Sequence, residues 1–168
     1  MSHADGGRAD ELPPPLRAAL GASSLPWRYE LTSTALRAYA RAAGYADLVY
    51  YHLDTARAAG FRDLPAPPGF LGVAVYVPGL SDEVFSEPSF GQPDVPHGLP
   101  RVLDLGTDTE HLAQLHAGDV LLATTTVVDI RPNGDGLLVV RELVFCDEPS
   151  GAVVARQRRS TLYLQALS

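Results

Sequence analysis

The fold is decided by VLLATTTVVDIRPNGDGLLVVRELVFC, residues 120–146. Residues 120–130 and 137–146 are rich in Val, Leu and Thr, and β-branched residues favour strands. Between them, residues 132–136 read Pro-Asn-Gly-Asp-Gly and contain the Asn-Gly signal of a tight hairpin turn. The stretch therefore predicts two long antiparallel strands joined by a hairpin.

Further strands are predicted on both sides of this hairpin. Residues 147–151, Asp-Glu-Pro-Ser-Gly, predict a turn, and residues 152–165 a strand after it. Upstream, residues 101–105 and 111–115 are shorter candidates, and residues 27–31 alternate like a short strand. Strands of this length in meander order predict an antiparallel sheet that can wrap around one helix.

Two segments compete for helical structure. Residues 65–77 are almost continuously apolar after Pro67 and Pro68, and periodicity does not decide between a buried strand and a buried helix. The paired prolines favour a helix N-terminus, and the Val content favours a strand. If helical, this segment is the one around which the sheet wraps. Residues 33–43 predict an amphipathic helix, with Thr32 or Ser33 as N-cap and Gly44 after its end.

Composition bounds the function. The 168 residues suit one domain over residues 26–168, preceded by a poorly ordered arm over residues 1–25 that is rich in Gly, Ala and Pro. The net charge of −7 disfavours nucleic acid and anionic membranes as partners. Without an apolar run of about 20 residues or a secretory signal, a cytoplasmic protein is expected. The single Cys146 and scattered His residues predict no disulfide, metal or other cofactor.

The stretch DLVYYHLD, residues 47–54, carries the chemistry. Asp47 and His52 are separated by four residues, and a carboxylate beside an imidazole can form an acid/base pair. We expect Asp54 to N-cap a short helix over residues 55–59, which places His52 in a loop two residues before that helix. Residues 78–100 hold five prolines and predict a long loop that is either surface decoration or a lid.

Four stretches together resemble a known family. DLVYYHLD resembles the Asp-x4-His-x-Asp segment of the MaoC-like (R)-specific hydratases and dehydratases, and ARAAGF, residues 56–61, resembles the helix that follows this segment in the family. APPGF, residues 66–70, resembles the turn into the central helix in their FAS1-like dehydratase branch, and LHAGDVL, residues 115–121, resembles the family's turn into the long strands. The resemblance covers residues 27–164. It implies the hot-dog fold, an α+β class in which a single long antiparallel sheet wraps around a central helix.

The resemblance also implies roles for particular residues. In dehydration of a (3R)-3-hydroxyacyl thioester, His52 would take the C2 proton and Asp47 would protonate the departing 3-hydroxyl. Pro68 has no N–H group, so the backbone N–H of Gly69 or Phe70 would stabilise the thioester oxygen. The residues expected to line the acyl site are Tyr51, Pro68, Phe85 and Phe90.

The implied partners are an acyl carrier protein or coenzyme A thioester, in fatty-acid or polyketide-type synthesis. Arg156, Arg158 and Arg159 are expected either to meet an acidic carrier protein or the phosphates of coenzyme A, or to form a solvated strand edge. We expect a homodimer, or a heterodimer with another hot-dog subunit. Two alternatives stay open: a non-catalytic subunit that binds acyl chains beside an active partner, and a thioesterase, which would need a carboxylate that residues 65–77 lack.

Overall fold

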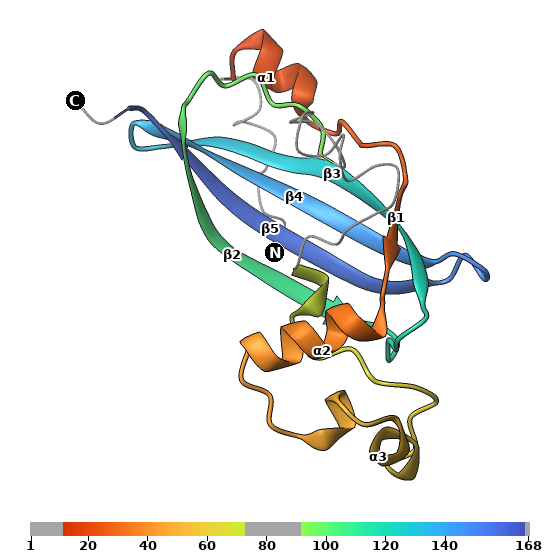
Figure 1. Cartoon of the computed structure of the whole chain (residues 1–168). Helices are drawn as coiled ribbons and strands as arrows, with labels where there is room; N and C mark the ends of the chain where they lie inside the picture. Colours follow the sequence, from red (N-terminus) through yellow and green to blue (C-terminus); the bar gives the residue numbers. More distant parts are fainter. Residues whose placement is uncertain (1–11, 73–91, 167–168) are drawn as a thin grey trace, which may run out of the picture.

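The structure, a computed structural model, describes residues 12–72 and 92–166. Its strands form one sheet, with α1 at one end and α2 and α3 at the other (Figure 1). In chain order the elements are α1 (Pro14–Ala19), β1 (Trp27–Glu30), α2 (Ser33–Ala42), the 3-10 helix η2 (Leu48–Tyr50), α3 (Leu53–Ala58), the 3-10 helix η3 (Phe70–Gly72), β2 (Arg101–His111), β3 (Val120–Asn133), β4 (Gly136–Asp147) and β5 (Val153–Leu164).

The sheet is antiparallel throughout, in the order β1-β3-β4-β5-β2. The β3–β4 hairpin turns between Asn133 and Gly136, where Gly134 has a φ of 60°. A second turn follows at residues 147–151, where Gly151 N–H donates to the Asp147 carbonyl at 2.8 Å. Both turns, and the strands over 27–31, 120–130, 137–146 and 152–165, are confirmed to within a few residues.

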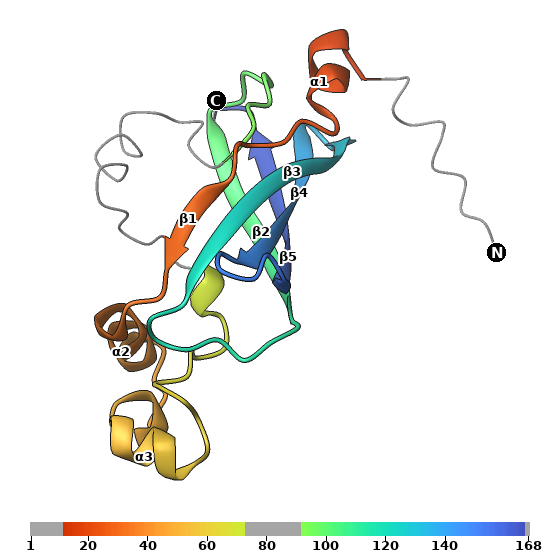
Figure 2. The ribbon, with the colours of Figure 1, turned by 90° about the vertical axis from the view of Figure 1, so that its right-hand side faces the viewer.

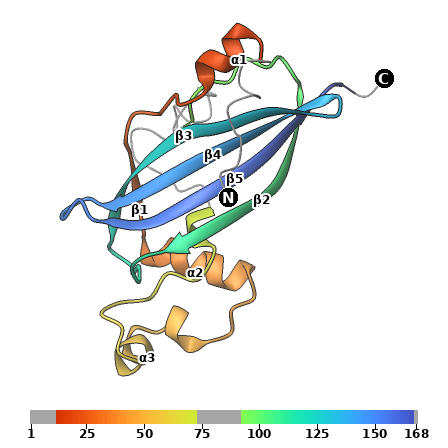
Figure 3. The same ribbon diagram turned by 180° about the vertical axis from the view of Figure 1, so that it is seen from behind.

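Strand β2 forms one edge of the sheet and pairs only with β5 (Figure 3). It is one strand of 11 residues, interrupted by a register shift between Asp104 and Gly106. The separate strand expected over 111–115 is therefore wrong beyond His111. The N–H groups of Leu112 and Ala113 both turn to the carbonyl of Val154, which ends the ladder.

Helix α2 lies across the end of the sheet near β1 (Figure 2). Thr32 caps it as predicted, because its hydroxyl oxygen accepts the N–H of Ala35 at 3.2 Å. Leu36 and Ala40 are fully buried on its inner side, and Gly44 follows its end with a φ of 79°. The helix expected over 33–43 is therefore confirmed.

The segment expected to hold the central helix is described only as far as Gly72. Within it, Phe70–Gly72 forms η3, and Phe70 and Leu71 are buried. They join a core cluster with Tyr29, Leu121 and Phe145 on the inner face of the sheet. Residues 73–77 lie outside the described residues, so a helix there stays a prediction.

The arm over residues 1–25 was expected to be poorly ordered, but its described part contains a helix that packs on the sheet. Residues 14–19 form α1, which begins with proline at its first positions, as helices tolerate. Its buried side chains Leu16 and Ala19, together with Leu12, pack on Ile130 and Val139 of the sheet. Sequence composition missed this contact because it depends on strands more than 100 residues away.

No helix in the described ranges is long and apolar enough to span a membrane.

Docking of α1 should contribute measurably to stability. Leu16 is 9% exposed and Leu25 is 86% exposed, although both belong to the N-terminal segment. We expect Leu16→Ala to lower the free energy of unfolding by about 2–4 kcal/mol, since it empties a buried site, and Leu25→Ala to change it little. Urea unfolding of both variants checks this, and equal effects would show that α1 is not docked in solution.

Candidate active site

Asp47 and His52 bracket the single turn of η2. Asp47 caps that turn, with its Oδ1 accepting the N–H of Val49 at 3.1 Å. The N–H of His52 donates to the carbonyl of Leu48 at 2.9 Å, which closes the turn. Both side chains are exposed. The motif therefore holds a carboxylate and an imidazole at the two ends of one short, hydrogen-bonded turn.

His52 itself occupies the N-cap position of α3, and the helix begins at Leu53. The expected cap at Asp54 is therefore wrong. Asp54 lies in the first helical turn, where a carboxylate interacts favourably with the helix dipole. The extended backbone of His52, with φ −116° and ψ 117°, makes it the last residue before the helix, and its imidazole makes no capping bond.

The carbonyl of Pro68 is held by two tyrosines. The hydroxyl of Tyr39 donates to it at 3.3 Å and that of Tyr45 at 3.1 Å. The C=O and N–H groups of a trans peptide point in opposite directions, and the described chain has no cis peptide bonds. The two hydroxyls therefore fix the direction of the Gly69 N–H, which has no hydrogen-bond partner among the described residues.

The backbone N–H of Phe70, unlike that of Gly69, has a hydrogen-bond partner among the described residues. Its N–H donates to the carbonyl of Pro67 at 3.1 Å. Its carbonyl accepts the hydroxyl of Tyr29 at 3.0 Å, and its ring packs edge-on against the rings of Tyr29 and Tyr39. Of the two N–H groups expected to serve as donors, only that of Gly69 is available in this arrangement.

Tyr50 and Tyr51 have different surroundings. The hydroxyl of Tyr51 donates to the carbonyl of Tyr45 at 2.6 Å, so it supports the loop. The ring of Tyr50 packs on that of Tyr45 at 5.3 Å. Burial raises the pKa of Tyr50, and the nearby Tyr45 and Asp47 raise it further. The sequence did not identify Tyr39, Tyr45 or Tyr50 as site residues, because their contacts join parts of the chain that no local pattern connects.

A cavity of about 430 Å³ lies beside the Pro68 turn. Its walls come from three parts of the chain: Tyr50, the 61–68 segment with Phe61, Pro65, Ala66 and Pro68, and residues 111–115. The described cavity does not include Asp47 or His52, but Tyr50 lies between them in sequence and lines it. Of the residues expected to contact substrate, Pro68 lines the cavity, Tyr51 does not, and Phe85 and Phe90 lie outside the described residues.

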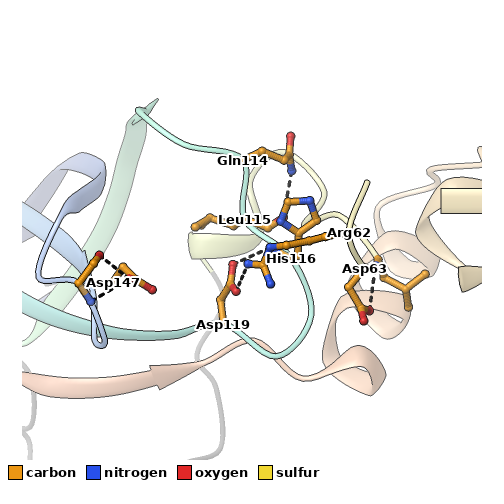
Figure 4. A network of polar contacts seen from close by, with 9 residues as sticks. Arg62, Asp63, Gln114, Leu115, His116, Asp119 and Asp147 are labelled. Atoms are coloured by element: carbon orange, nitrogen blue, oxygen red, sulfur yellow. Dashed lines mark hydrogen bonds and ion pairs between the residues drawn. The ribbon is translucent and has the colours of Figure 1, made fainter. Parts of the chain in front are cut away.

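The cavity wall is tied to the sheet through Asp119 (Figure 4). This carboxylate, nearly buried, forms an ion pair with Arg62 and accepts the backbone N–H of His116 at 2.9 Å. The neighbouring chain segments are joined by Ala117 N–H to the Leu64 carbonyl and Ala66 N–H to the Leu115 carbonyl, each at 2.8 Å. Burial lowers the pKa of the His116 imidazole and Arg62 lowers it further, against the opposing effect of Asp119. His116 is thus part of the support for residues 62–66.

A larger hollow of about 480 Å³ lies between β1, α2 and the 117–120 turn. It contains the carboxylates of Glu30, Asp63 and Asp119, of which Glu30 pairs with Arg28 and Asp119 with Arg62. Across the described residues, no three His, Cys, Asp or Glu side chains group as a metal site would require. Neither cavity is bordered by Asp47, His52 or Gly69, and the smaller one is the better candidate because Tyr50 of η2 and Pro68, the residue before Gly69, both line it.

The three arginines of β5 do not form one cluster. Arg156 and Arg158 are exposed on the outer face. Glu110 lies opposite Arg156, and Asp108 and Glu142 lie opposite Arg158 on the two neighbouring strands. Arg159 lies on the inner face and is half-buried, and burial lowers its pKa. Successive side chains of a strand alternate between faces, so the sequence itself contained the signal for this separation.

Gly69 should tolerate no side chain, for two separable reasons. Its φ of 84° is strained for other residues, and an added Cβ would lie 2.4 Å from the Tyr39 hydroxyl oxygen. Gly60 has a similar φ of 91° with open space around it. We expect Gly60→Ala to cost about 1–2 kcal/mol from the backbone alone, and Gly69→Ala to cost more.

The part of the cost of Gly69→Ala that exceeds the cost of Gly60→Ala is due to the Tyr39 hydroxyl. This difference in unfolding free energy should therefore shrink when Gly69→Ala is placed in a Tyr39→Phe background. A double-mutant cycle by chemical unfolding measures this coupling. Additive effects of Gly69→Ala and Tyr39→Phe would contradict the contact.

Comparisons with known proteins agree on the fold. Among solved structures, the 3R-hydroxyacyl-ACP dehydratase complex HadBC from Mycobacterium tuberculosis is 17% identical, with a TM-score of 0.68, over 86% of this chain and 96% of that chain. A MaoC-like dehydratase is 20% identical, with a TM-score of 0.73, over 90% of this chain and 44% of that one. The R-hydratase PhaJ1 from Pseudomonas aeruginosa is 15% identical, with a TM-score of 0.63, over 95% of this chain and 86% of that chain.

These likenesses confirm the predicted α+β hot-dog fold. Comparison with curated proteins gives no match. A family model described as the FAS1-like, dehydratase domain region matches residues 18–157, most of the chain. The chain therefore belongs to the FAS1-like dehydratase domain family.

Proposed function

We propose that this protein is a hydro-lyase that removes water from a (3R)-3-hydroxyacyl thioester and leaves the 2-enoyl thioester. The observation that carries this proposal is the placement of Asp47 and His52 at the two ends of one turn, in a chain of this family. His52 takes the C2 proton, the C2–C3 double bond forms, and Asp47 protonates the 3-hydroxyl as it leaves as water. Both groups are needed because the C2 hydrogen is a weak acid and hydroxide is a poor leaving group.

The Gly69 N–H is the proposed donor to the thioester oxygen, which gains negative charge when C2 loses its proton. Such a donor works best when its direction is fixed before the reaction. The hydroxyls of Tyr39 and Tyr45 on the Pro68 carbonyl supply that fixation. We propose Tyr50 and Pro68 as substrate contacts, because both line the cavity, and we assign Tyr51 to loop support.

The thioester is proposed to be carried by an acyl carrier protein, in cytoplasmic fatty-acid or polyketide-type synthesis, with coenzyme A as the other possible carrier. HadBC is a 3R-hydroxyacyl-ACP dehydratase, which supports the choice. Arg156 and Arg158 are exposed and remain candidate contacts for an acidic carrier, whereas Arg159 faces inward. The nearby acidic side chains of the outer face offset part of this attraction.

A second hot-dog subunit is proposed to cover the edge at β2. This strand exposes Val102, Leu103 and Leu105 together with unpaired backbone groups, and such an edge readily pairs with another strand. The exposed Asp47 and His52 also need cover, since an acid/base pair works best where water is excluded. HadBC and ChsH1-ChsH2 are complexes, which supports pairing with another hot-dog subunit, and a homodimer of this chain is the other assembly proposed.

The catalytic assignment predicts matched losses of activity. His52→Ala and Asp47→Asn should each lower the rate of dehydration by about 10²-fold or more, the size of a general acid/base contribution. The double variant should lose little more than either single one, because the pair acts as a unit. Asp54→Asn, an exposed acid two residues after His52, should keep its activity. The measurement is loss of water from a (3R)-3-hydroxyacyl carrier-protein thioester, followed by mass spectrometry.

Equal turnover by wild type and His52→Ala would end the assignment. If neither turned over until a second hot-dog subunit with its own Asp/His pair was added, and His52→Ala in this chain then had no effect, the protein would be the non-catalytic partner. Because the Asp47 and His52 side chains are both exposed in the single chain, the non-catalytic partner is a definite alternative.

The assembly can be tested on its own. Light scattering at micromolar concentration should give a dimer, either of this chain or with its partner. Leu103→Asp/Leu105→Asp should shift it to monomer, because two charges would be buried at the pairing edge, whereas Leu25→Asp, at another exposed site, should not. A wild-type monomer, with and without other hot-dog subunits, would exclude the proposed interface.

A further inference from the structure

Tyr45 lies at the junction between α2 and the turn that carries Asp47 and His52. It follows Gly44 at the end of α2, and its N–H donates to the carbonyl of Ala40 at 2.9 Å, as in the Schellman cap of a helix. Its side chain is half-buried. A tyrosine whose backbone is fixed in this way can hold other segments in place, because its ring is rigid and its side chain has few rotatable bonds.

The hydroxyl of Tyr45 acts on the turn at Pro68. It donates to the carbonyl of Pro68 at 3.1 Å, and the hydroxyl of Tyr39 donates to the same carbonyl at 3.3 Å. This carbonyl and the N–H of Gly69 belong to one planar peptide. Both hydroxyls therefore act on the direction of the proposed donor to the thioester oxygen.

The backbone and the ring of Tyr45 act on the turn η2. Its carbonyl accepts the hydroxyl of Tyr51 at 2.6 Å, and its ring packs on the ring of Tyr50, with centres 5.3 Å apart and planes inclined by 58°. Tyr50 ends η2, and Tyr51 is the C-cap of that turn. One residue thus contacts both the end of η2 and the turn that holds Gly69.

The contact at Tyr51 reaches His52 through one peptide bond. The carbonyl of Tyr51 accepts the Nε of Arg37 at 3.0 Å, and the N–H of His52 donates to the carbonyl of Leu48 at 2.9 Å. These two groups belong to the same planar peptide, so this peptide is held from both sides. With the side chain of Tyr51 held by Tyr45, these bonds fix the backbone of His52 relative to Tyr45.

Tyr39 shares one part of this arrangement and lacks the other. Its hydroxyl donates to the Pro68 carbonyl, as that of Tyr45 does, and its ring packs edge-on against Phe70. Among the described residues, no hydrogen bond joins its side chain to residues 47–52. Tyr39 therefore provides a matched control, with the same acceptor and no side-chain hydrogen bond to η2.

The two halves of the site must act on neighbouring atoms of one substrate. The proposed base removes the proton on C2, and the negative charge that results collects on the oxygen of the thioester carbonyl next to C2. The covalent bonds of the substrate fix the distance between these atoms. His52 and the Gly69 N–H must therefore be held at a matching separation, and a change in that separation slows the reaction.

We propose that Tyr45 is a positioning residue that keeps His52 and the Gly69 N–H at a fixed separation, through a chain of contacts that we name the Tyr45 bridge. It runs from Gly69 to Tyr45 through the Pro68 carbonyl. From Tyr45 it runs to His52 through Tyr51. The Tyr45 bridge stands on these contacts alone, and only its effect on turnover rests on the proposed function.

The Tyr45 bridge is tested first without catalysis, by the backbone amide resonances of the ligand-free protein in proton–nitrogen NMR spectra. Tyr51→Phe should shift the Gly69 amide, although the removed hydroxyl does not bond to the Pro68 turn. Tyr45→Phe should shift the amides of both Gly69 and His52. Tyr39→Phe should shift that of Gly69 and leave that of His52 unchanged. Each variant removes one hydroxyl and keeps the aromatic ring, so the packing of the rings is preserved.

Turnover is tested second, with a (3R)-3-hydroxyacyl carrier-protein thioester. Tyr45→Phe and Tyr51→Phe should each lower kcat by about tenfold, a loss of the kind that misplaced groups cause. KM should change little, because the ring at position 45 stays against Tyr50. Since either change opens the same bridge, the double variant Tyr45→Phe/Tyr51→Phe should lose about as much as one single variant. In the control pair Tyr39→Phe/Tyr51→Phe, the changes act at separate points and the two losses should multiply.

The two tests separate the Tyr45 bridge from the reaction. Amide shifts as described, in a protein without turnover, would remove the proposed hydro-lyase function and support the bridge. A Gly69 amide that stays unchanged in Tyr51→Phe would overturn the bridge. So would losses in kcat that multiply for Tyr45→Phe/Tyr51→Phe as they do for the control pair.

Discussion

The alternation of side chains along β4 and β5 is the constraint on which the rest of this molecule depends. Because neighbours in a strand face opposite sides, one register places Phe145, Leu143 and Val139 inward and leaves Glu142 outward. The same register on β5 places Gln157 and Arg159 inward and Arg156 and Arg158 outward. A shift by one residue would exchange these sets, so the pairing fixes both the dry surface and the inward charges.

The segment that carries Asp47 and His52 depends on the sheet mainly through a few polar contacts and the packing of residues 64–71. Helix α3 lies beyond the end of the sheet (Figure 2), and polar contacts join residues 45–72 to the rest of the chain. Tyr45 and Tyr39 hold the Pro68 turn, Tyr29 holds Phe70 from the sheet, and Asp119 holds residues 62–66 through Arg62. Each attachment is a polar group with a defined direction. Such contacts add defined directions to the packing of Leu64, Phe70 and Leu71, which are buried in the core cluster.

Local signals explain what the sequence predicted correctly. The helix after Thr32 follows from a capping hydroxyl and apolar residues at helical spacing, and the β3–β4 hairpin follows from Asn-Gly between β-branched runs. The docking of α1 and the bonds to the Pro68 carbonyl join distant parts of the chain, and no local pattern encodes them. The start of α3 was misplaced by two residues because an Asp suits both the N-cap and the first turn. Strand alternation places Arg159 on the opposite face from Arg156 and Arg158, but the three were grouped because they are close in sequence.

The position of β2 also bears on how the chain folds. β2 precedes β3 and β4 in the chain, yet its sheet partner is β5, the last of the described strands. β1 likewise cannot pair until its partner β3 has been synthesised. Contacts between segments far apart in sequence form slowly, and unpaired strands with exposed apolar side chains are prone to association while they wait. The edge that we assign to a partner subunit is therefore also the part of the nascent chain most in need of protection, and early pairing with that partner would shorten its exposure.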